Sequence, residues 1–192
     1  MRYFFSFFII LLSAHASAQV KVLINFLQPK TPASSDTIYF NPSRKLVWND
    51  FKGTPEPNHI ALAITSSGLG YSAAMKSTNG AGTITINVFC YFDKEKSWVK
   101  VGKQSDYALT HEQHHFDVSY LATNLFVTKL KAAKFTLSNY ALLLQKIYTE
   151  ALQNLESMQN AYDGETKNGQ LKNIQAVWNK KIDDSLKAIV TH

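Results

Sequence analysis

The alternation of hydrophobic and polar positions predicts strands in the first half of the chain. In residues 83–92, TITINVFCYF, Thr and Asn alternate with Ile, Val and Phe, which is typical of a strand with one buried face. STNGAG at 77–82 predicts a hairpin turn before it. Strand composition also occurs at 37–40, 45–48 and 59–75, and a break is expected at Gly68 and Gly70 within the last segment. We expect a small, mostly antiparallel sheet.

From Asp106 onward the hydrophobic period becomes helical. Apolar residues at three- and four-residue spacing, without proline, predict a first helix over 106–132. A second helix is expected from Ser138, a suitable N-cap, to Tyr162, and a third over 170–189. The polar, glycine-bounded segment DGETKNG at 163–169 predicts a loop between them. Strands followed by helices indicate the α+β class.

The first 18 residues have the pattern of a secretory signal peptide. Arg2 precedes an apolar run from Tyr3 to Leu12, and small residues then end in A-x-A at 16–18. The apolar run is shorter than the roughly 20 residues of a membrane-spanning helix. We therefore expect cleavage near Ala18, export to the periplasm or the extracellular space, and no membrane span after cleavage.

The rest of the chain has a suitable length for one domain with its own core. Residues 19–36 include the Pro- and Ser-rich QPKTPASSD and are expected to form a flexible lead-in, followed by a single domain over 37–192. Cys90 is the only cysteine, which excludes an intrachain disulfide. The formal net charge of +6 becomes +5 without Arg2, but the lysines are scattered, which argues against nucleic-acid binding.

Candidate chemistry is concentrated in the first predicted helix, where His111, Glu112 and His115 form H-E-x-x-H. Two histidines four residues apart are separated by about 40 degrees around a helix, so both imidazoles can reach one ion. Glu112, beside that face, can take a proton from a metal-activated water and pass it to a leaving amine. A solvated polar helix face is the other interpretation, and the apolar positions beside the histidines disfavour it.

A tetrahedral zinc site in a hydrolase needs a third protein ligand. The candidates are Asp163, Glu150 and Glu165. Asp163 ranks first because it opens the predicted loop, where a side chain is free to point inward. Acidic residues near helix ends also cap or solvate helices, so the choice stays open. His114 projects about 100 degrees from its neighbour and Asp117 lies on the opposite side of the helix, so both are weaker candidates.

Two further features bear on catalysis. Tyr162 adjoins the proposed ligand and Tyr107 lies one turn before the first histidine, so either phenol could donate a hydrogen bond to an oxyanion; simple packing is the alternative for both. The strand at 83–92 is a candidate edge strand to which an extended peptide substrate could add, although it is equally suited to the interior of the sheet.

Motifs beyond H-E-x-x-H extend over nearly all of the chain after residue 45. They are LVWNDFKGTPEPN (46–58), AITSSGLGYS (63–72), SWVK (97–100), HEQHHFD (111–117) and MQNAYDGETKNGQ (158–170), followed by Q-x-x-W up to Trp178. With these segments the chain resembles a family of predicted secreted zinc-dependent proteases of bacteria, domain of unknown function 922. The resemblance implies a single zincin-like protease domain over 37–192 and supplies no substrate.

One position departs from the pattern of that family. Asn168 stands where the family has a histidine before the glycine. If that histidine is the third ligand, zinc binding is weakened here, because an amide is a poorer zinc ligand than imidazole. If Asp163 is the ligand, the change is tolerable, and the retained Tyr162, Glu165 and Thr166 favour this second reading.

Two functions are therefore expected. The first is a secreted zinc metallopeptidase that hydrolyses peptide or amide bonds of a peptide or protein substrate. In it, His111, His115 and Asp163 hold Zn²⁺, and Glu112 and Tyr162 take part in catalysis. The alternative is a non-catalytic envelope binding protein that retains the protease fold, which the altered residue before the glycine favours.

Overall fold

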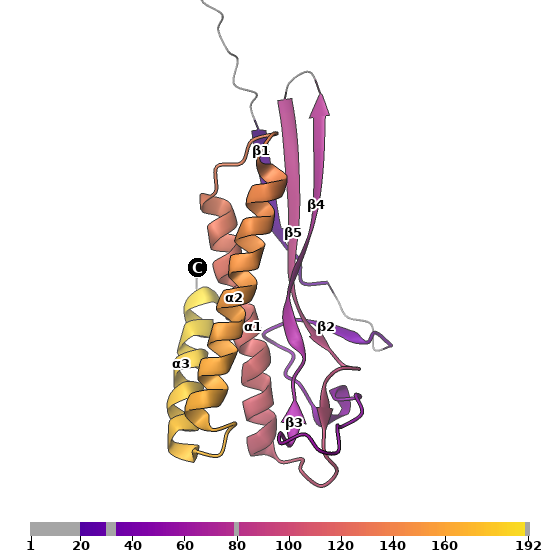
Figure 1. Ribbon diagram of the computed structural model, residues 1–192, viewed down its shortest axis with the longest axis vertical. Helices are drawn as coiled ribbons and strands as arrows, with labels where there is room; N and C mark the ends of the chain where they lie inside the picture. Colours follow the sequence, from indigo (N-terminus) through magenta and orange to yellow (C-terminus); the bar gives the residue numbers. More distant parts are fainter. Residues whose placement is uncertain (1–19, 30–33, 79–80, 191–192) are drawn as a thin grey trace, which may run out of the picture.

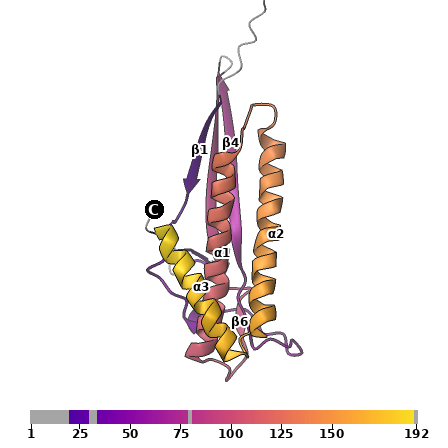
Figure 2. The same cartoon turned by 90° about the vertical axis from the view of Figure 1, so that its left-hand side faces the viewer.

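Three helices lie on one side of a mixed sheet and form an elongated molecule (Figures 1 and 2). The computed structural model describes residues 20–29, 34–78 and 81–190. The strands are β1 (Val20–Phe26), β2 (Thr37–Tyr39), β3 (Ala63–Ile64), β4 (Ser67–Thr78), β5 (Ala81–Asp93) and β6 (Trp98–Val99). The helices are α1 (Asp106–Ala132), α2 (Tyr140–Thr166) and α3 (Lys172–Val190), with a short 3₁₀ helix at Trp48–Asp50. The α+β class is confirmed.

The sheet is built around β5. The antiparallel partner β4 follows β5 along its length, from Thr78 opposite Ala81 to Ser67 opposite Phe92. Because β4 fills that edge, β1 and β2 follow one another along the other edge, β1 parallel and β2 antiparallel. The strand predicted at 83–92 is therefore confirmed, but its use as an edge strand for substrate is wrong, since both of its edges are paired.

The flexible lead-in predicted for residues 19–36 is wrong over β1. The sequence VKVLINF places Val22 and Ile24 toward the core and Lys21 and Leu23 away from it, as expected of a strand with one buried face. Parallel pairing with β5 then satisfies the backbone groups along one edge of this segment. Residues 30–33 of the predicted lead-in, and the predicted signal peptide over 1–18, lie outside the described residues.

Two other sequence predictions for the first half are wrong in detail. The segment 45–48 forms no strand, because side chains take its backbone donors: the amide of Leu46 donates to Gln113 Oε1 and that of Val47 to Asp50 Oδ2. The break expected at Gly68 and Gly70 falls just before these glycines, between β3 and β4. β3 pairs instead with β6 in a separate two-stranded sheet.

The helix predicted over 106–132 is confirmed with the same bounds. Its N-cap is Ser105, whose side chain accepts a hydrogen bond from the amide of Ala108. The second helix begins later than predicted and continues through residue 163 to Thr166, and the third begins at Lys172. The extension of α2 changes the setting of the proposed third ligand, which lies in the last turn of a helix and not in a loop.

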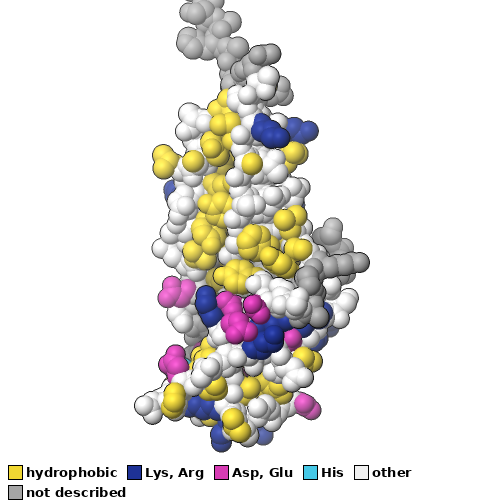
Figure 3. All heavy atoms as spheres, turned by 90° about the vertical axis from the view of Figure 1, so that its right-hand side faces the viewer, with side chains coloured by type: hydrophobic (Ala, Val, Ile, Leu, Met, Phe, Trp, Pro, Cys, Tyr) yellow, Lys and Arg dark blue, Asp and Glu magenta, His cyan; other side chains and the backbone are white. Residues whose placement is uncertain are grey.

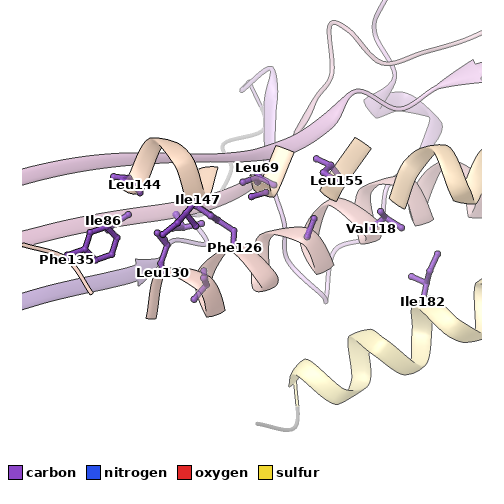
Figure 4. Close-up of a cluster of buried hydrophobic side chains, with 14 of the residues drawn as sticks. Leu69, Ile86, Val118, Phe126, Leu130, Phe135, Leu144, Ile147, Leu155 and Ile182 are labelled. Carbon is purple, nitrogen blue, oxygen red and sulfur yellow. The ribbon is translucent and has the colours of Figure 1, made fainter. Parts of the chain in front are cut away.

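The hydrophobic core lies between the sheet and the helices. Its larger part joins β4, β5, α1 and α2 (Figure 4), with Ile86, Phe126 and Leu130 fully or almost fully buried. A second part joins α1 to the first half of the chain, where the ring of Tyr120 stacks on Phe40 at 3.8 Å between centroids. The other face of the sheet is partly exposed, and Figure 3 shows hydrophobic side chains on this side of the molecule together with charged ones.

The packing of α1 fixes its position in the fold. Apolar side chains from both parts of the core surround it, and α3 lies against it on the side away from β5 (Figure 2). Within the described residues, no helix is both long enough and apolar enough to span a bilayer.

If β1 is a core strand, neighbouring residues in it should differ sharply in their effect on stability. Ile24→Ala removes a side chain that packs on the core and is expected to lower the free energy of unfolding by about 1–2 kcal/mol, less than at a fully buried site. Leu23→Ala, on the outward side, is the matched control and is expected to change it by less than about 0.5 kcal/mol. Urea unfolding measures both, and equal effects would contradict the docking of β1.

Candidate metal centre

The first turns of α1 carry the two histidines of H-E-x-x-H on one side of the helix. His111 and Glu112 are both buried, and His115 is partly buried. The Nε2 atoms of the two imidazoles lie 3.2 Å apart. The helical spacing of four residues brings both ring nitrogens to one point, as predicted.

Asp163 completes the group from the last turn of α2. Its Oδ1 atom lies 3.2 Å from Nε2 of His111 and 3.0 Å from Nε2 of His115. Together these three side chains form a group that could hold a metal ion, and it is the one such group within the described part of the chain. The sequence expectation that Asp163 points inward is met, although from a helix end instead of a loop.

A glutamine on α2 sets the proton position of His115. The Oε1 atom of Gln159 lies 2.5 Å from Nδ1 of the ring. The amide nitrogen of Gln159 donates to the carbonyl oxygen of His115 and to Ser119 Oγ, so its oxygen must be the atom that faces the imidazole. In the neutral ring Nδ1 therefore carries the proton, and Nε2 is the nitrogen that faces Asp163.

A second glutamine, on α3, does the same for His111. Oε1 of Gln175 lies 2.9 Å from Nδ1 of the ring. Its amide nitrogen donates to the Tyr162 hydroxyl and to Asn179 Oδ1, which again leaves the oxygen to accept the Nδ1 proton. The Tyr162 hydroxyl in turn donates to the carbonyl oxygen of His111. Hydrogen bonds of this kind orient metal-binding histidines and fix their tautomer.

The resulting arrangement is that of a cation site. Two imidazole Nε2 atoms and a carboxylate oxygen converge within 3.0–3.2 Å of one another, and Asp163 Oδ1 is buried between the two rings. For metal–donor bonds of about 2.0–2.1 Å, the donors of a tetrahedral ion are spaced by about 3.3 Å. The observed spacings of 3.0–3.2 Å are close to one face of such a tetrahedron.

The electrostatics of the group show what competes with a cation. Burial on its own would raise the pKa of Asp163, but the two imidazoles beside it hold this pKa well below its usual range. Burial on its own lowers the pKa of His115, yet Asp163, Glu112 and Gln159 outweigh burial and raise it. Without a cation, a proton on His115 pairs with Asp163, so protons and metal ions compete for one place.

Glu112 borders the pocket in front of this group. Its carboxylate is buried, and Oε2 has no hydrogen-bond partner among the described residues. The carbonyl oxygen of the same residue accepts a hydrogen bond from Thr65 Oγ1, which ties α1 to the segment between β3 and β4. A buried carboxylate with a free oxygen is poised to accept a proton from a molecule inside the pocket.

The pocket has a volume of about 640 Å³. It is bordered by the segment 59–67, the first turns of α1 and the connection between α2 and α3, at the lower end of the molecule in Figure 1. All three members of the metal-binding group and Glu112 line it, as does Asn168. A substrate in this space would therefore meet the ion and the proposed base together.

A left-handed turn after α2 presses against the site. Lys167, Asn168 and Gly169 have φ angles of 53, 53 and 77 degrees. A Cβ atom at Gly169 would lie 3.2 Å from Nδ1 of His111, so both the backbone conformation and the close approach favour glycine. The Tyr107 hydroxyl donates to the carbonyl oxygen of Gly169, which fixes the turn to the first turn of α1.

Several sequence candidates lie elsewhere. Glu150 pairs with Lys129 at 2.8 Å, and Glu165 accepts a hydrogen bond from the indole of Trp178, so neither belongs to the metal-binding group. His114 faces Asp183 of α3, on another side of α1 from the paired histidines, as its helical position predicts.

Asp117 is a buried structural group, in agreement with its predicted position on the far side of α1. It is fully buried, and its Oδ1 atom accepts a hydrogen bond from Gln113. Burial raises the pKa of Asp117, which Lys45 and Gln113 partly offset. Gln113 also accepts the amide proton of Leu46, so the pair links α1 to the first half of the chain.

Tyr162 packs against His111 and does not line the pocket. It is fully buried, its ring stacks on His111 at 4.8 Å between centroids, and burial raises the pKa of its hydroxyl. With its hydroxyl engaged by Gln175 and by the His111 carbonyl, this geometry gives no support to a role at an oxyanion. Tyr107 does border the pocket, but its hydroxyl is directed to Gly169.

Sequence reasoning missed Gln159 and Gln175. A signal was present, since Gln175 falls on the apolar face of α3 together with Trp178 and Ile182, and it is 1% exposed. Gln159 lies one turn before Asp163 on α2. A glutamine at helical spacing from buried positions indicates an internal hydrogen-bond partner.

Comparison with known proteins adds no identification. The chain matches no family model, no curated protein and no solved structure. The case for a metal centre therefore depends on the geometry of the residues themselves.

If the two glutamines fix the imidazole tautomers, their removal should weaken metal binding without unfolding the protein. Gln159→Ala and Gln175→Ala are each expected to lower metal affinity by about 10–100-fold. Gln153→Ala, on the exposed side of α2, is the matched control and should leave affinity unchanged. Zinc titration against a competing chelator measures the affinity, with circular dichroism as the check on folding. Unchanged affinity in both variants would remove the glutamines from the site.

Metal affinity should also depend on pH in a defined direction. Because the pKa of His115 is raised above that of a free histidine, the competing proton binds at a higher pH than it would to a free histidine. Affinity is expected to be full above this pKa and to fall by about tenfold for each pH unit below it, for one proton displaced per ion. Chelator competition between about pH 8 and 6 tests this. A flat profile would show that the imidazole does not bind the ion.

Proposed function

We propose that this protein is a zinc-dependent metallopeptidase-like hydrolase that cleaves peptide or amide bonds. One observation carries the proposal: three side chains that could hold a metal ion, His111, His115 and Asp163, converge beside a pocket, next to the free oxygen of the buried Glu112 carboxylate. A purely structural ion site has no need of an open pocket or of a free buried carboxylate.

Zinc is the ion that this donor set favours. Two imidazoles and one carboxylate suit a borderline ion better than Ca²⁺ or Mg²⁺, which prefer six or more oxygen donors. Three protein donors, with the pocket in front of them, leave a coordination position for water or substrate, as in hydrolytic zinc sites.

The residues of the chain divide the work of hydrolysis. Bound zinc would supply Lewis-acid activation of water and of the scissile carbonyl. Glu112 accepts the proton of the attacking water and returns it to the leaving amine, which makes it the general base and then the general acid. Gln159 and Gln175 hold the imidazoles in the ligating tautomer.

The proposal includes family and location. Membership in the predicted secreted zinc-dependent proteases, domain of unknown function 922, is supported by the segments at 46–58, 63–72, 111–117 and 158–170, which also carry the groups now found together at the site. Export is supported by the composition of residues 1–18.

One observation favours a second candidate, a non-catalytic binding protein. Asn168 stands where the family has a histidine, and it borders the pocket. If a histidine at this position takes part in turnover, its replacement leaves a metal-bearing pocket that binds peptides without cleaving them. The retained Glu112 and the complete ligand group favour the enzyme.

Zinc content and hydrolysis together separate the two candidates. The purified protein should contain about one zinc per chain, and Asp163→Ala should lose it, because only two donors remain. Glu112→Gln should keep the zinc and lose about 10²–10⁴-fold in kcat on a peptide panel, since the proton acceptor is gone. Elemental analysis and a fluorogenic assay measure these quantities.

The outcomes are distinct. Zinc in the wild type without hydrolysis of any panel peptide would favour the binding protein, above all if Asn168→His then acquires activity. Equal hydrolysis by wild type and Glu112→Gln would refute the assigned base. Absence of zinc from the wild type would refute the metal centre.

A further inference from the structure

Apart from the residues of the metal centre, the charged side chains that line the pocket are all positive. The two carboxylates that border the pocket, Glu112 and Asp163, belong to the proposed machinery. The other charged side chains on the wall are Lys103 and Lys172. From this we infer, on the basis of the proposed function, that the pocket selects peptides carrying a carboxylate, which the two lysines bind.

The two lysines come from elements fixed to the site. Lys172 is the first residue of α3, and its Nζ atom lies 5.6 Å from the ring centroid of Tyr107. Tyr107 lies one turn before His111 on α1, and its hydroxyl donates a hydrogen bond to the carbonyl oxygen of Gly169. The contact with Tyr107 therefore places Lys172 on the same side of the pocket as His111. The positive end of the α3 dipole is at the same place. Lys103 lies in the connection from β6 to α1.

Neither lysine is neutralised within the protein. Among the described residues, carboxylate partners within 4.0 Å belong to other lysines, namely Lys45, Lys96, Lys129 and Lys180. The nearby Lys100 donates to the carbonyl oxygen of His59. Lys103 and Lys172 are exposed, and the contact of Lys172 with Tyr107 leaves its charge intact.

The wall opposite α1 adds an apolar surface. Ile60 and Leu62, in the segment before β3, border the same pocket and are 91% and 52% exposed. Exposed aliphatic side chains beside unpaired ammonium groups suit a peptide that carries an apolar residue next to its carboxylate. The carboxylate can belong to an Asp or Glu side chain or to the C-terminus of the peptide, and both present the same group to the lysines.

Three fluorogenic peptides of Leu, Ala and Gly distinguish these sources. One contains a single Asp and ends in an amide, one has Asn at that position and ends in an amide, and one has Asn and a free C-terminus. Wild type is expected to cleave at least one carboxylate peptide with a kcat/KM about three- to tenfold above that of the neutral peptide, the range for exposed ion pairs. The preference should shrink in high salt.

The double variant Lys103→Gln/Lys172→Gln should lose this preference while keeping the rate on the neutral peptide. Lys131→Gln/Lys134→Gln changes the net charge equally at exposed positions near the other end of α1 and should retain it. A preference that survives in the pocket double variant would mean that the ion or the helix dipole binds the carboxylate, and would overturn the role of the lysines.

A binding measurement keeps the inference separate from catalysis. The Glu112→Gln protein, with zinc bound, is titrated with the same three peptides by calorimetry, alone and combined with the pocket double variant. Tighter binding of a carboxylate peptide that is lost in the combination supports the inference even if no peptide is cleaved, in which case only the proposed hydrolysis fails. Equal affinity for all three peptides, or binding of none, would overturn it.

Discussion

The enclosure of α1 is the constraint on which the rest of the structure depends. Core residues from the sheet, from α2 and from the first half of the chain surround this helix, and α3 closes another side. Polar groups on an enclosed helix must find partners inside the protein. Neighbouring elements therefore supply these partners. Gln159 and Asp163 come from α2, and Gln175 comes from α3. On another side of α1, the backbone amide of Leu46 donates a hydrogen bond to Gln113.

The same constraint separates two roles along one short sequence. In HEQHHFD, the ring nitrogens of His111 and His115 face each other and Asp163 at the pocket. Gln113, His114 and Asp117 instead make contacts that join α1 to the first half of the chain and to α3. The sequence alone shows a dense polar run. The 100-degree step of the helix divides this run into a side that faces the pocket and a side that contacts other elements.

Local signals determined how much could be predicted. The bounds of α1 and the pairing of its two histidines depend on helical spacing, and the structure agrees with them. Asp163 is predicted as a loop residue, and although it lies in a helix it joins the group that could hold a metal ion. The end of α2 was misplaced because Gly164 suggested a loop, whereas the helix continues to Thr166. β1 escaped notice because its partner β5 is about 60 residues away, and the roles of both glutamines depend on contacts between separate helices.

The left-handed turn at residues 167–169 has a consequence for the architecture of the site. Surface connections normally tolerate insertions, because few contacts depend on their length. This one begins four residues after Asp163, abuts the imidazole of His111 and leads directly into the helix that carries Gln175. An added residue would shift Asp163, the backbone of Gly169 and the side-chain amide of Gln175 relative to one another. The α2–α3 connection thus acts as a spacer of fixed length, which holds Asp163 and Gln175 in place relative to His111.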